Sequence, residues 1–164
     1  MHARARNSAA AGAEELELTI HRTFDAPRAL VFRAWTEPQH LARWSCPRGF
    51  TMMENRGELR VGGGFSAWMR SPEGEDHRLR GVYREIAPPE RLVFTHSWLD
   101  ASGAPGPETL VTVTLAERDG RTEMTFHQAG FGSVASRDGH ERGWASSFEL
   151  LTELLAKVRR DVEA

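Results

Sequence analysis

The most regular hydrophobic pattern in the chain lies near its end, where large apolar residues recur at intervals of three or four. They are Trp144, Phe148, Leu151, Leu155 and Val158. This spacing puts them on one face of an α-helix. Asp138 and Glu141 have the spacing of a capping box, so we expect a helix from about residue 138 to about residue 160. Such a face must cover either a filled core or the roof of a pocket.

Earlier in the chain, apolar and polar residues alternate instead, which is the pattern of half-buried β-strands. The alternation predicts strands over residues 15–24, 50–55, 65–70, 77–86, 91–99, 109–117 and 122–128. Short turns rich in Gly, Pro or Asp separate most of the later strands, and Asp119-Gly120 is a strong hairpin signal. Because connections of this size join neighbouring strands that run in opposite directions, we expect an antiparallel sheet.

Two short helices are expected between the first and the second strand. Pro27 suits the first turn of a helix, where its missing N–H has no helical partner. Thr36 and Gln39 have capping-box spacing and begin a second helix, so a break between the two helices is expected.

The complete order of elements is strand, two short helices, about six strands and one long helix. One face of the sheet must be covered, and only the last helix is long enough to cover it. We therefore predict an α+β fold with a curved antiparallel sheet of six to seven strands around a long C-terminal helix. Residues 15–164 are expected to form a single domain, and residues 1–14 a flexible N-terminal tail.

Charge and cysteine content exclude several classes of function. Among 164 residues the formal net charge is −2, with basic and acidic residues interspersed, which argues against a nucleic-acid surface. The single Cys46 allows no internal disulfide and no multi-cysteine metal site, so a reducing, cytoplasmic location is expected. No apolar run approaches the ~20 residues that span a membrane. Residues 1–14 lack the apolar centre of a secretory signal, which leaves a tag, a tail or a targeting segment.

Two short motifs resemble functional signatures but lack a part that the chemistry requires. "HERGW" begins as the zinc-protease motif H-E-x-x-H does, but Trp144 stands where the second histidine would bind the metal. "GFGSVA", residues 130–135, resembles a dinucleotide-binding loop, but no parallel strand with an acidic residue follows it. We therefore expect no metal site, no cofactor and no catalytic residue, which favours a binding protein while leaving enzymatic activity open.

Three polar residues fall on strand faces that are otherwise apolar. His96 continues the inward phase of its strand, Gln128 does the same in the last strand, and Arg22 interrupts the apolar face of the first. His127 falls on the opposite face from Gln128, toward solvent. A polar residue on an apolar face is either satisfied within the core or available to a ligand in a cavity. Together the three residues are the main internal indication of a pocket.

Several longer motifs resemble those of a known family. The motifs are "TFDAPRALVFRAWTEPQHLARW", "GGG", "GVYREIAPPERLVFT", "TEMTFHQAGF" and "HERGW", in that order. They closely resemble the bacterial AHSA1-type branch of the START-like, or SRPBCC, superfamily over roughly residues 16–158. The resemblance implies the helix-grip fold, in which a curved antiparallel sheet grips a long C-terminal helix over a deep apolar cavity.

The resemblance says less about function than about fold. Superfamily members include lipid carriers, polyketide cyclases and aromatases, plant allergen-type binders and co-chaperone domains, so function must be argued from the site. The matching motif residues are mainly structural, namely Pro27, Trp35, Gly81, Pro89, Gly143 and Trp144. The activator of Hsp90 ATPase itself carries a separate N-terminal domain, whereas about fifteen residues precede the first strand here, so Hsp90 is not expected as a partner.

These observations lead us to expect a small soluble protein that binds an apolar or aromatic small molecule between the sheet and the helix. The residues expected to line the site are Phe65, Trp68, Phe94, His96, Trp98, Met124, Phe126, Gln128, Trp144 and Phe148. The helix half with Trp144 and Phe148 is expected to roof the pocket, and the half from Leu151 to Val158 to be core. Gly143, unfavourable inside a helix, is expected where the backbone lies close to the sheet or where space is needed.

Two alternatives remain open. The first is an enzyme of the cyclase or hydrolase type acting on a ketide-like substrate, with His96 as its acid or base. The second is a protein-interaction module, either co-chaperone-like or a homodimer, which an exposed apolar patch would favour. The identity of the ligand and the oligomeric state do not follow from the sequence.

Overall fold

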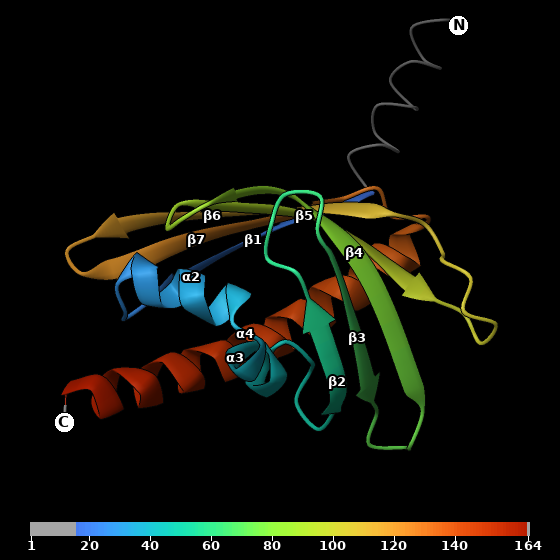
Figure 1. Cartoon of the computed structure of the whole chain (residues 1–164), viewed down its shortest axis with the longest axis horizontal. Coiled ribbons are helices and arrows are strands. Elements are labelled where there is room, and N and C mark those ends of the chain that lie inside the picture. Colours follow the sequence, from blue (N-terminus) through green and yellow to red (C-terminus); the bar gives the residue numbers. More distant parts are fainter. Residues whose placement is uncertain (1–15, 164) are drawn as a thin grey trace, which may run out of the picture.

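The structure, a computed structural model, describes residues 16–163 and follows the predicted order of elements (Figure 1). In chain order the elements are β1 (Glu17–Phe24), α2 (Arg28–Thr36), α3 (Pro38–Trp44), β2 (Thr51–Gly57), β3 (Gly64–Arg70), β4 (Asp76–Ala87), β5 (Arg91–Leu99), β6 (Thr109–Arg118), β7 (Arg121–Ala129) and α4 (Val134–Glu163). The strand bounds agree with the alternation of the sequence to within two residues at each end. The expected tail, residues 1–14, lies outside the described residues, as does Glu15.

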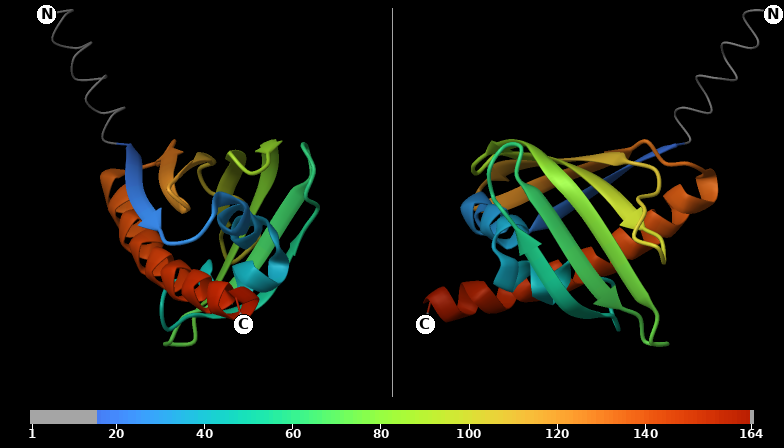
Figure 2. Two further views of the ribbon diagram at one scale, coloured as in Figure 1. Left: turned by 90° about the vertical axis from the view of Figure 1, so that its left-hand side faces the viewer. Right: turned by 45° about the vertical axis from the view of Figure 1, so that its right-hand side comes forward.

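Neighbouring strands in the sheet are antiparallel throughout, in the order β1-β7-β6-β5-β4-β3-β2. The β6–β7 hairpin turns at Asp119-Gly120, whose φ angles of 54° and 77° are those of a tight two-residue turn. The sheet curves, and α4 runs obliquely along its concave side (Figures 1 and 2). The predicted α+β helix-grip architecture is confirmed.

The short helices α2 and α3 lie at one end of this concave side, where α2 contacts β6 and β7, and α3 contacts β2. Glu37 separates them with an extended backbone (φ −86°, ψ 125°), because Pro38 disfavours a helical conformation in the residue before it. Pro38 then occupies the first turn of α3. The expected capping box at Thr36 is wrong, since the Thr36 hydroxyl donates back to the carbonyl of Phe32 at 3.0 Å.

The long helix begins earlier than its hydrophobic periodicity indicates. α4 starts at Val134 rather than near Asp138 and has 30 residues. The backbone N–H of Ser136 donates to the Ser133 hydroxyl at 3.1 Å, so Ser133 caps the helix. Asp138, the expected cap, pairs instead with the neighbouring Arg137. The sequence missed the first turn because Val134 and Ala135 are exposed there and the turn carries no apolar stripe.

An irregularity in the pairing of β4 with β5 accompanies the curvature of the sheet. The ladder shifts register after Tyr83, and the N–H of Val82 donates to the side-chain hydroxyl of Thr95 at 2.9 Å. Gly81 lies at this point, where a Cβ atom would stand 1.9 Å from the Thr95 carbonyl oxygen and 2.3 Å from Cζ of Phe65. Any side chain would therefore force the two strands apart, which explains the glycine.

The buried apolar residues form two clusters. The larger one joins α2 and α4 to β1 and β5–β7 around Trp35, Phe126, Phe148 and Leu151. The smaller one consists of Cys46, Met69 and Leu79, on the β3–β4 side of the sheet. Residues of both clusters line the cavity described below. Within residues 16–163, none of the helices carries an apolar stretch long enough to cross a lipid bilayer.

Candidate ligand-binding cavity

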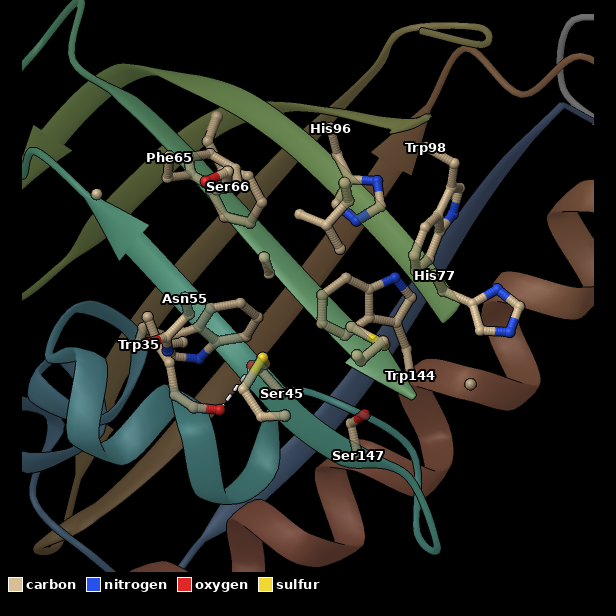
Figure 3. A pocket seen from close by; sticks show the side chains of 18 of the residues that line it. Trp35, Ser45, Asn55, Phe65, Ser66, His77, His96, Trp98, Trp144 and Ser147 are labelled. Atoms are coloured by element: carbon tan, nitrogen blue, oxygen red, sulfur yellow. Dashed lines mark hydrogen bonds between the residues drawn. The ribbon is translucent and has the colours of Figure 1, made fainter. Parts of the chain in front are cut away.

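A cavity of about 500 Å³ lies on the concave side of the sheet, between strands β2–β5 and helices α3 and α4 (Figure 3). Its wall is mainly apolar and rich in rings, including Trp35, Phe65, Tyr83, Phe94 and Trp144. Volumes of roughly 300–1,000 Å³ are typical of small-molecule sites. The space is therefore large enough for a ligand of several rings, or an equivalent aliphatic molecule.

Half of the residues expected from the sequence line this cavity. They are Phe65, Phe94, His96, Trp98 and Trp144. Phe94, His96 and Trp98 come from one face of β5, as the alternation of that strand predicts. Trp144 comes from α4, and its ring lies near His96 and Trp98 (Figure 3).

Trp68 does not line the cavity, which corrects the expectation. It lies between Ala67 and Met69 on β3, and these two point inward, so alternation turns Trp68 to the convex face. There its indole N–H donates to Asp76 at 2.9 Å, and the guanidinium of Arg78 lies 4.5 Å from the ring centre. Phe65 and Trp68 are three residues apart, so they point to opposite faces of a regular strand, and both could not be expected to line the cavity.

Four further expected residues belong to the filled core rather than to the cavity wall. They are Met124, Phe126, Gln128 and Phe148, none more than 1% exposed. The Trp144 ring covers this part of the sheet, 4.6 Å from the ring centre of Phe126. The Phe148 ring packs 5.3 Å from Phe126 in the same layer. Their strand phase is inward, as predicted, but α4 leaves no space above them.

Gln128 holds the cavity wall in place without touching the space. Its amide oxygen accepts from the Trp144 indole N–H at 2.8 Å, and its amide nitrogen donates to the Thr109 hydroxyl at 2.9 Å. Thr109 in turn donates to the backbone carbonyl of His96 at 2.9 Å. This buried chain ties the orientation of Trp144 to the strand that carries His96. Arg22, the third polar candidate, is exposed on the edge strand β1 and does not line the cavity.

The sequence reasoning missed several residues of the cavity wall. His140 is not among the expected lining residues, but it lines the cavity and accepts a hydrogen bond from the Trp98 indole N–H at 2.7 Å. Because that indole can only donate, Nε2 of His140 is the acceptor, and Nδ1 therefore carries the proton that it donates to the Ser136 carbonyl at 2.7 Å. Helical spacing could have identified His140 as a lining residue, because it lies one turn before Trp144 on the same face of the helix.

Tyr83 and Leu79 on β4 and Trp35 on α2 were also missed as lining residues. Alternation about Gly81 places both β4 residues inward, so their strand phase could have found them. Trp35 was interpreted only as a structural residue, because no local pattern shows what a short helix faces.

His96 is the most deeply buried ionisable group of the cavity. It is 5% exposed, and among residues 16–163 no group hydrogen-bonds to its imidazole. Burial, with a smaller contribution from His140, lowers the pKa of His96 from 6.5 to about 3. The imidazole is therefore neutral at physiological pH and presents one donor and one acceptor nitrogen.

Charged groups are confined to the edge of the cavity. Its lining, within the part of the chain that the structure describes, contains no Asp, Glu or Lys. Arg56 is its single arginine, with a side chain that is 77% exposed and paired with Glu54 at 2.7 Å. His77, His96 and His140 all line the space, but no three metal-ligating side chains among residues 16–163 are placed to share a metal ion.

The chain matches the model of one protein family, whose description is Activator of Hsp90 ATPase homolog 1-like protein, over residues 25–156. This span contains α2, α3, strands β2–β7 and most of α4, and therefore every element of the cavity wall. A search of curated protein sequences gave no significant match.

Solved structures of several bacterial proteins are similar to this chain. A protein from Arthrobacter aurescens, determined by NMR in solution, is 29% identical with a TM-score of 0.78, and the match covers 88% of each chain. Protein CV1439 from Chromobacterium violaceum is 28% identical with a TM-score of 0.77, over 85% of this chain and 96% of that one. The AHSA1 protein of Silicibacter pomeroyi is 25% identical with a TM-score of 0.77, over 85% of this chain and 97% of that one. The similarity thus extends over nearly the whole of each relative.

Proposed function

The chain belongs to the family of Activator of Hsp90 ATPase homolog 1-like proteins, and from this membership and the cavity we propose that it binds an apolar small molecule between the sheet and α4. The observation that carries the proposal is a space of about 500 Å³ inside the fold, lined by aromatic and aliphatic side chains. An aromatic ligand that buries about 200 Å² there would gain about 5 kcal/mol before the costs of binding.

The polar groups of the wall support binding better than catalysis. The indole N–H groups of Trp98 and Trp144 already donate to His140 and Gln128. His96 is the most deeply buried acid–base candidate of the wall, but a pKa of about 3 makes its imidazole a weak base at neutral pH. An acid–base mechanism that used His96 would therefore lack a base poised near the working pH.

The co-chaperone-like alternative has less support. The exposed large apolar residues among residues 16–163 are Met53, Leu59, Val61, Leu110 and Val134. Leu59 and Val61 lie together in the β2–β3 connection, whereas the others come from β2, β6 and the start of α4. They do not form one broad surface of the kind that protein partners cover.

Titration with N-phenyl-1-naphthylamine, a neutral apolar dye that fluoresces when it leaves water, tests the proposal. We expect saturable binding at a one-to-one ratio. Ala67 lies on β3 with its side chain toward the cavity, so Ala67→Phe should occupy part of the space and weaken dye binding at least about tenfold.

Ala116→Phe is the matched control, because Ala116 is exposed on β6 away from the cavity. It introduces the same side chain and should leave dye affinity unchanged. Dye binding that is absent in the wild type, or equally strong in Ala67→Phe and Ala116→Phe, would contradict a cavity ligand.

A further inference from the structure

We propose that the ligand of this cavity is an uncharged, largely aromatic molecule that carries a hydroxyl or carbonyl oxygen, and that His96 hydrogen-bonds to this oxygen. The inference rests on the proposed binding function and specifies its ligand class. It is carried by the imidazole of His96, which faces the cavity without a hydrogen-bond partner, and by the buried indole N–H of Trp35, which also has none, together with the absence of Asp, Glu and Lys from the lining in residues 16–163.

The imidazole of His96 is the first of these groups. Its ring projects from the middle of β5 into the cavity, with Phe65 and Trp98 on either side (Figure 3). It is 5% exposed, and no group in residues 16–163 hydrogen-bonds to it. Buried polar groups in proteins are normally hydrogen-bonded, so a ligand atom is the expected partner. A neutral imidazole offers both a donor and an acceptor, which matches a hydroxyl group in either direction.

The indole N–H of Trp35 is the second group. Four of the five tryptophans donate their N–H to Ala34, Asp76, His140 or Gln128. Trp35 does not, and its Nε1 is the buried side-chain nitrogen or oxygen without a partner in the described residues. Trp35 lines the cavity. Because an indole N–H can only donate, an acceptor oxygen satisfies it and a cation does not.

Both groups adjoin the same aromatic surface, so one ligand can lie against both. The ring centre of Trp144 is 6.0 Å from that of Trp35 and 6.3 Å from that of His96. Gln128 fixes this ring through the hydrogen bond to its N–H. A flat aromatic ligand packed against Trp144 would therefore lie beside the imidazole of His96, with Trp35 in the same wall.

The electrostatics of the wall disfavour a charged ligand. A buried carboxylate or ammonium needs an opposite charge, because its desolvation is otherwise uncompensated. The lining within residues 16–163 contains no Asp, Glu or Lys, and Arg56 is exposed and paired with Glu54. His96 cannot supply a positive charge at neutral pH, since its pKa is lowered to about 3. A carboxylate and an ammonium would therefore both bind more weakly than the neutral scaffold.

Four probes with one scaffold test the inference at pH 7, by displacement of N-phenyl-1-naphthylamine. They are biphenyl, 4-phenylphenol, biphenyl-4-carboxylate and 4-phenylbenzylamine. We expect 4-phenylphenol, uncharged at this pH, to bind about fivefold more tightly than biphenyl, which is the usual effect of one neutral hydrogen bond. Both charged probes should bind at least about tenfold more weakly than biphenyl.

His96→Phe removes the hydrogen-bonding group and keeps an aromatic ring, so it should abolish the preference for 4-phenylphenol over biphenyl. His127→Phe is the matched control, because the His127 side chain is 37% exposed on the opposite face of the sheet. It should keep the wild-type order of affinities. His96→Gln retains a donor and an acceptor and should keep the preference for the phenol.

The wild-type series alone decides the inference if a variant fails to fold. Equal affinity for biphenyl and 4-phenylphenol would overturn the ligand class while leaving the cavity function intact. Tighter binding of the carboxylate or the amine would overturn it as well. If neither the dye nor any probe binds, the proposed function itself fails, so the two failures are distinguishable.

Discussion

At the scale of single residues, a small number of positions determine the shape and polarity of the cavity. Gly81 lets β4 approach β5 closely and leaves room for the Phe65 ring, which would otherwise meet a Cβ atom at 2.3 Å. Gln128 uses its amide oxygen to orient Trp144. His96 provides a neutral imidazole inside an apolar wall. Each role depends on contacts with residues far away in the sequence.

The two glycines that were interpreted as structural should respond in opposite ways to alanine. Gly81→Ala places a methyl group 1.9 Å from a backbone oxygen, so we expect a loss of unfolding free energy of ~3 kcal/mol or more. At Gly143 the nearest atom to a new Cβ is Cγ of Pro47 at 3.8 Å, an ordinary contact. Gly143→Ala should therefore stabilise the helix by about 0.5–1 kcal/mol.

Urea unfolding of both glycine variants measures these effects. Of the two alternatives expected for Gly143, close approach to the sheet is wrong, because Pro47 in the loop after α3 is its neighbour, whereas Gly143 does border the space of the cavity. Destabilisation of Gly143→Ala by more than 1 kcal/mol would show that the helix cannot accept the methyl group at this position.

His96 also makes the stability of the fold depend on pH. Its pKa is lowered by burial from 6.5 to about 3, so within this range the unfolded chain binds a proton that the folded chain does not. The stability contributed by a neutral His96 is therefore complete above pH 6.5 and is lost as the pH falls toward 3. We expect the unfolding free energy of the wild type to fall more steeply than that of His96→Phe, by up to ~1.4 kcal/mol per pH unit.

Urea unfolding of both proteins between pH 4.5 and 7 measures this difference, and other titrating groups cancel in the comparison. If the unfolding free energies of the wild type and of His96→Phe changed equally with pH, the folded protein would accept a proton at His96, and water would reach the imidazole.

At the scale of elements, α4 is divided into a half that faces the cavity and a half that fills the core. Its cavity-facing residues are Ser136, Gly139, His140, Gly143, Trp144 and Ser147. They recur at helical spacing, but most are small, so they leave space instead of forming an apolar stripe. Farther along, Leu151, Leu154 and Leu155 are at most 5% exposed. Trp144 thus lines the cavity, whereas Phe148, which was expected to roof it, is core.

Truncations in the two halves of α4 should therefore have different effects. Leu155→Ala should reduce the unfolding free energy by ~2–5 kcal/mol and leave the affinity of the folded protein for N-phenyl-1-naphthylamine unchanged. Trp144→Ala should change dye affinity several-fold, because the cavity gains the volume of the ring. Its stability loss should be below the ~3–5 kcal/mol of a fully packed aromatic residue.

Urea unfolding and dye titration of the two variants provide the measurements. If Trp144→Ala unfolds as readily as Leu155→Ala and binds dye as the wild type does, the whole helix face is core. The cavity would then not depend on the first half of α4.

At the scale of the whole molecule, the cavity results from the way in which one long helix packs against a curved sheet. On the side of β1, β6 and β7, large side chains of α4 and α2 fill the space above the sheet. On the side of β2–β4, the facing helix residues are mostly small, and the second apolar cluster does not reach them. The result is a mainly apolar space whose most deeply buried ionisable group, His96, is neutral at physiological pH, which suits an uncharged ligand.

The sequence by itself determined the elements, their order and the inward face of nearly every strand. The alternation of β5 predicted that His96 points inward, and His96 is 5% exposed. The alternation of β7 predicted that His127 points outward, and its side chain is 37% exposed. These features are local, because successive side chains of a strand point to opposite faces whatever lies beyond them. The same reasoning would have found Tyr83 and would have rejected Trp68.

Only the tertiary structure decided which inward residues border empty space. Phe94 and Phe126 have the same strand phase, yet Phe94 lines the cavity and Phe126 is covered by Trp144 and Phe148. The difference depends on the residue sizes of α4 and on its distance from each strand, which no local pattern encodes. Local patterns also did not place Trp35 and His140 in the site, because each is positioned there by contacts between elements that are distant in the sequence. The direction of a side chain is set by its own backbone. A cavity, in contrast, exists only where two packed surfaces leave space between them, so it depends on both surfaces together.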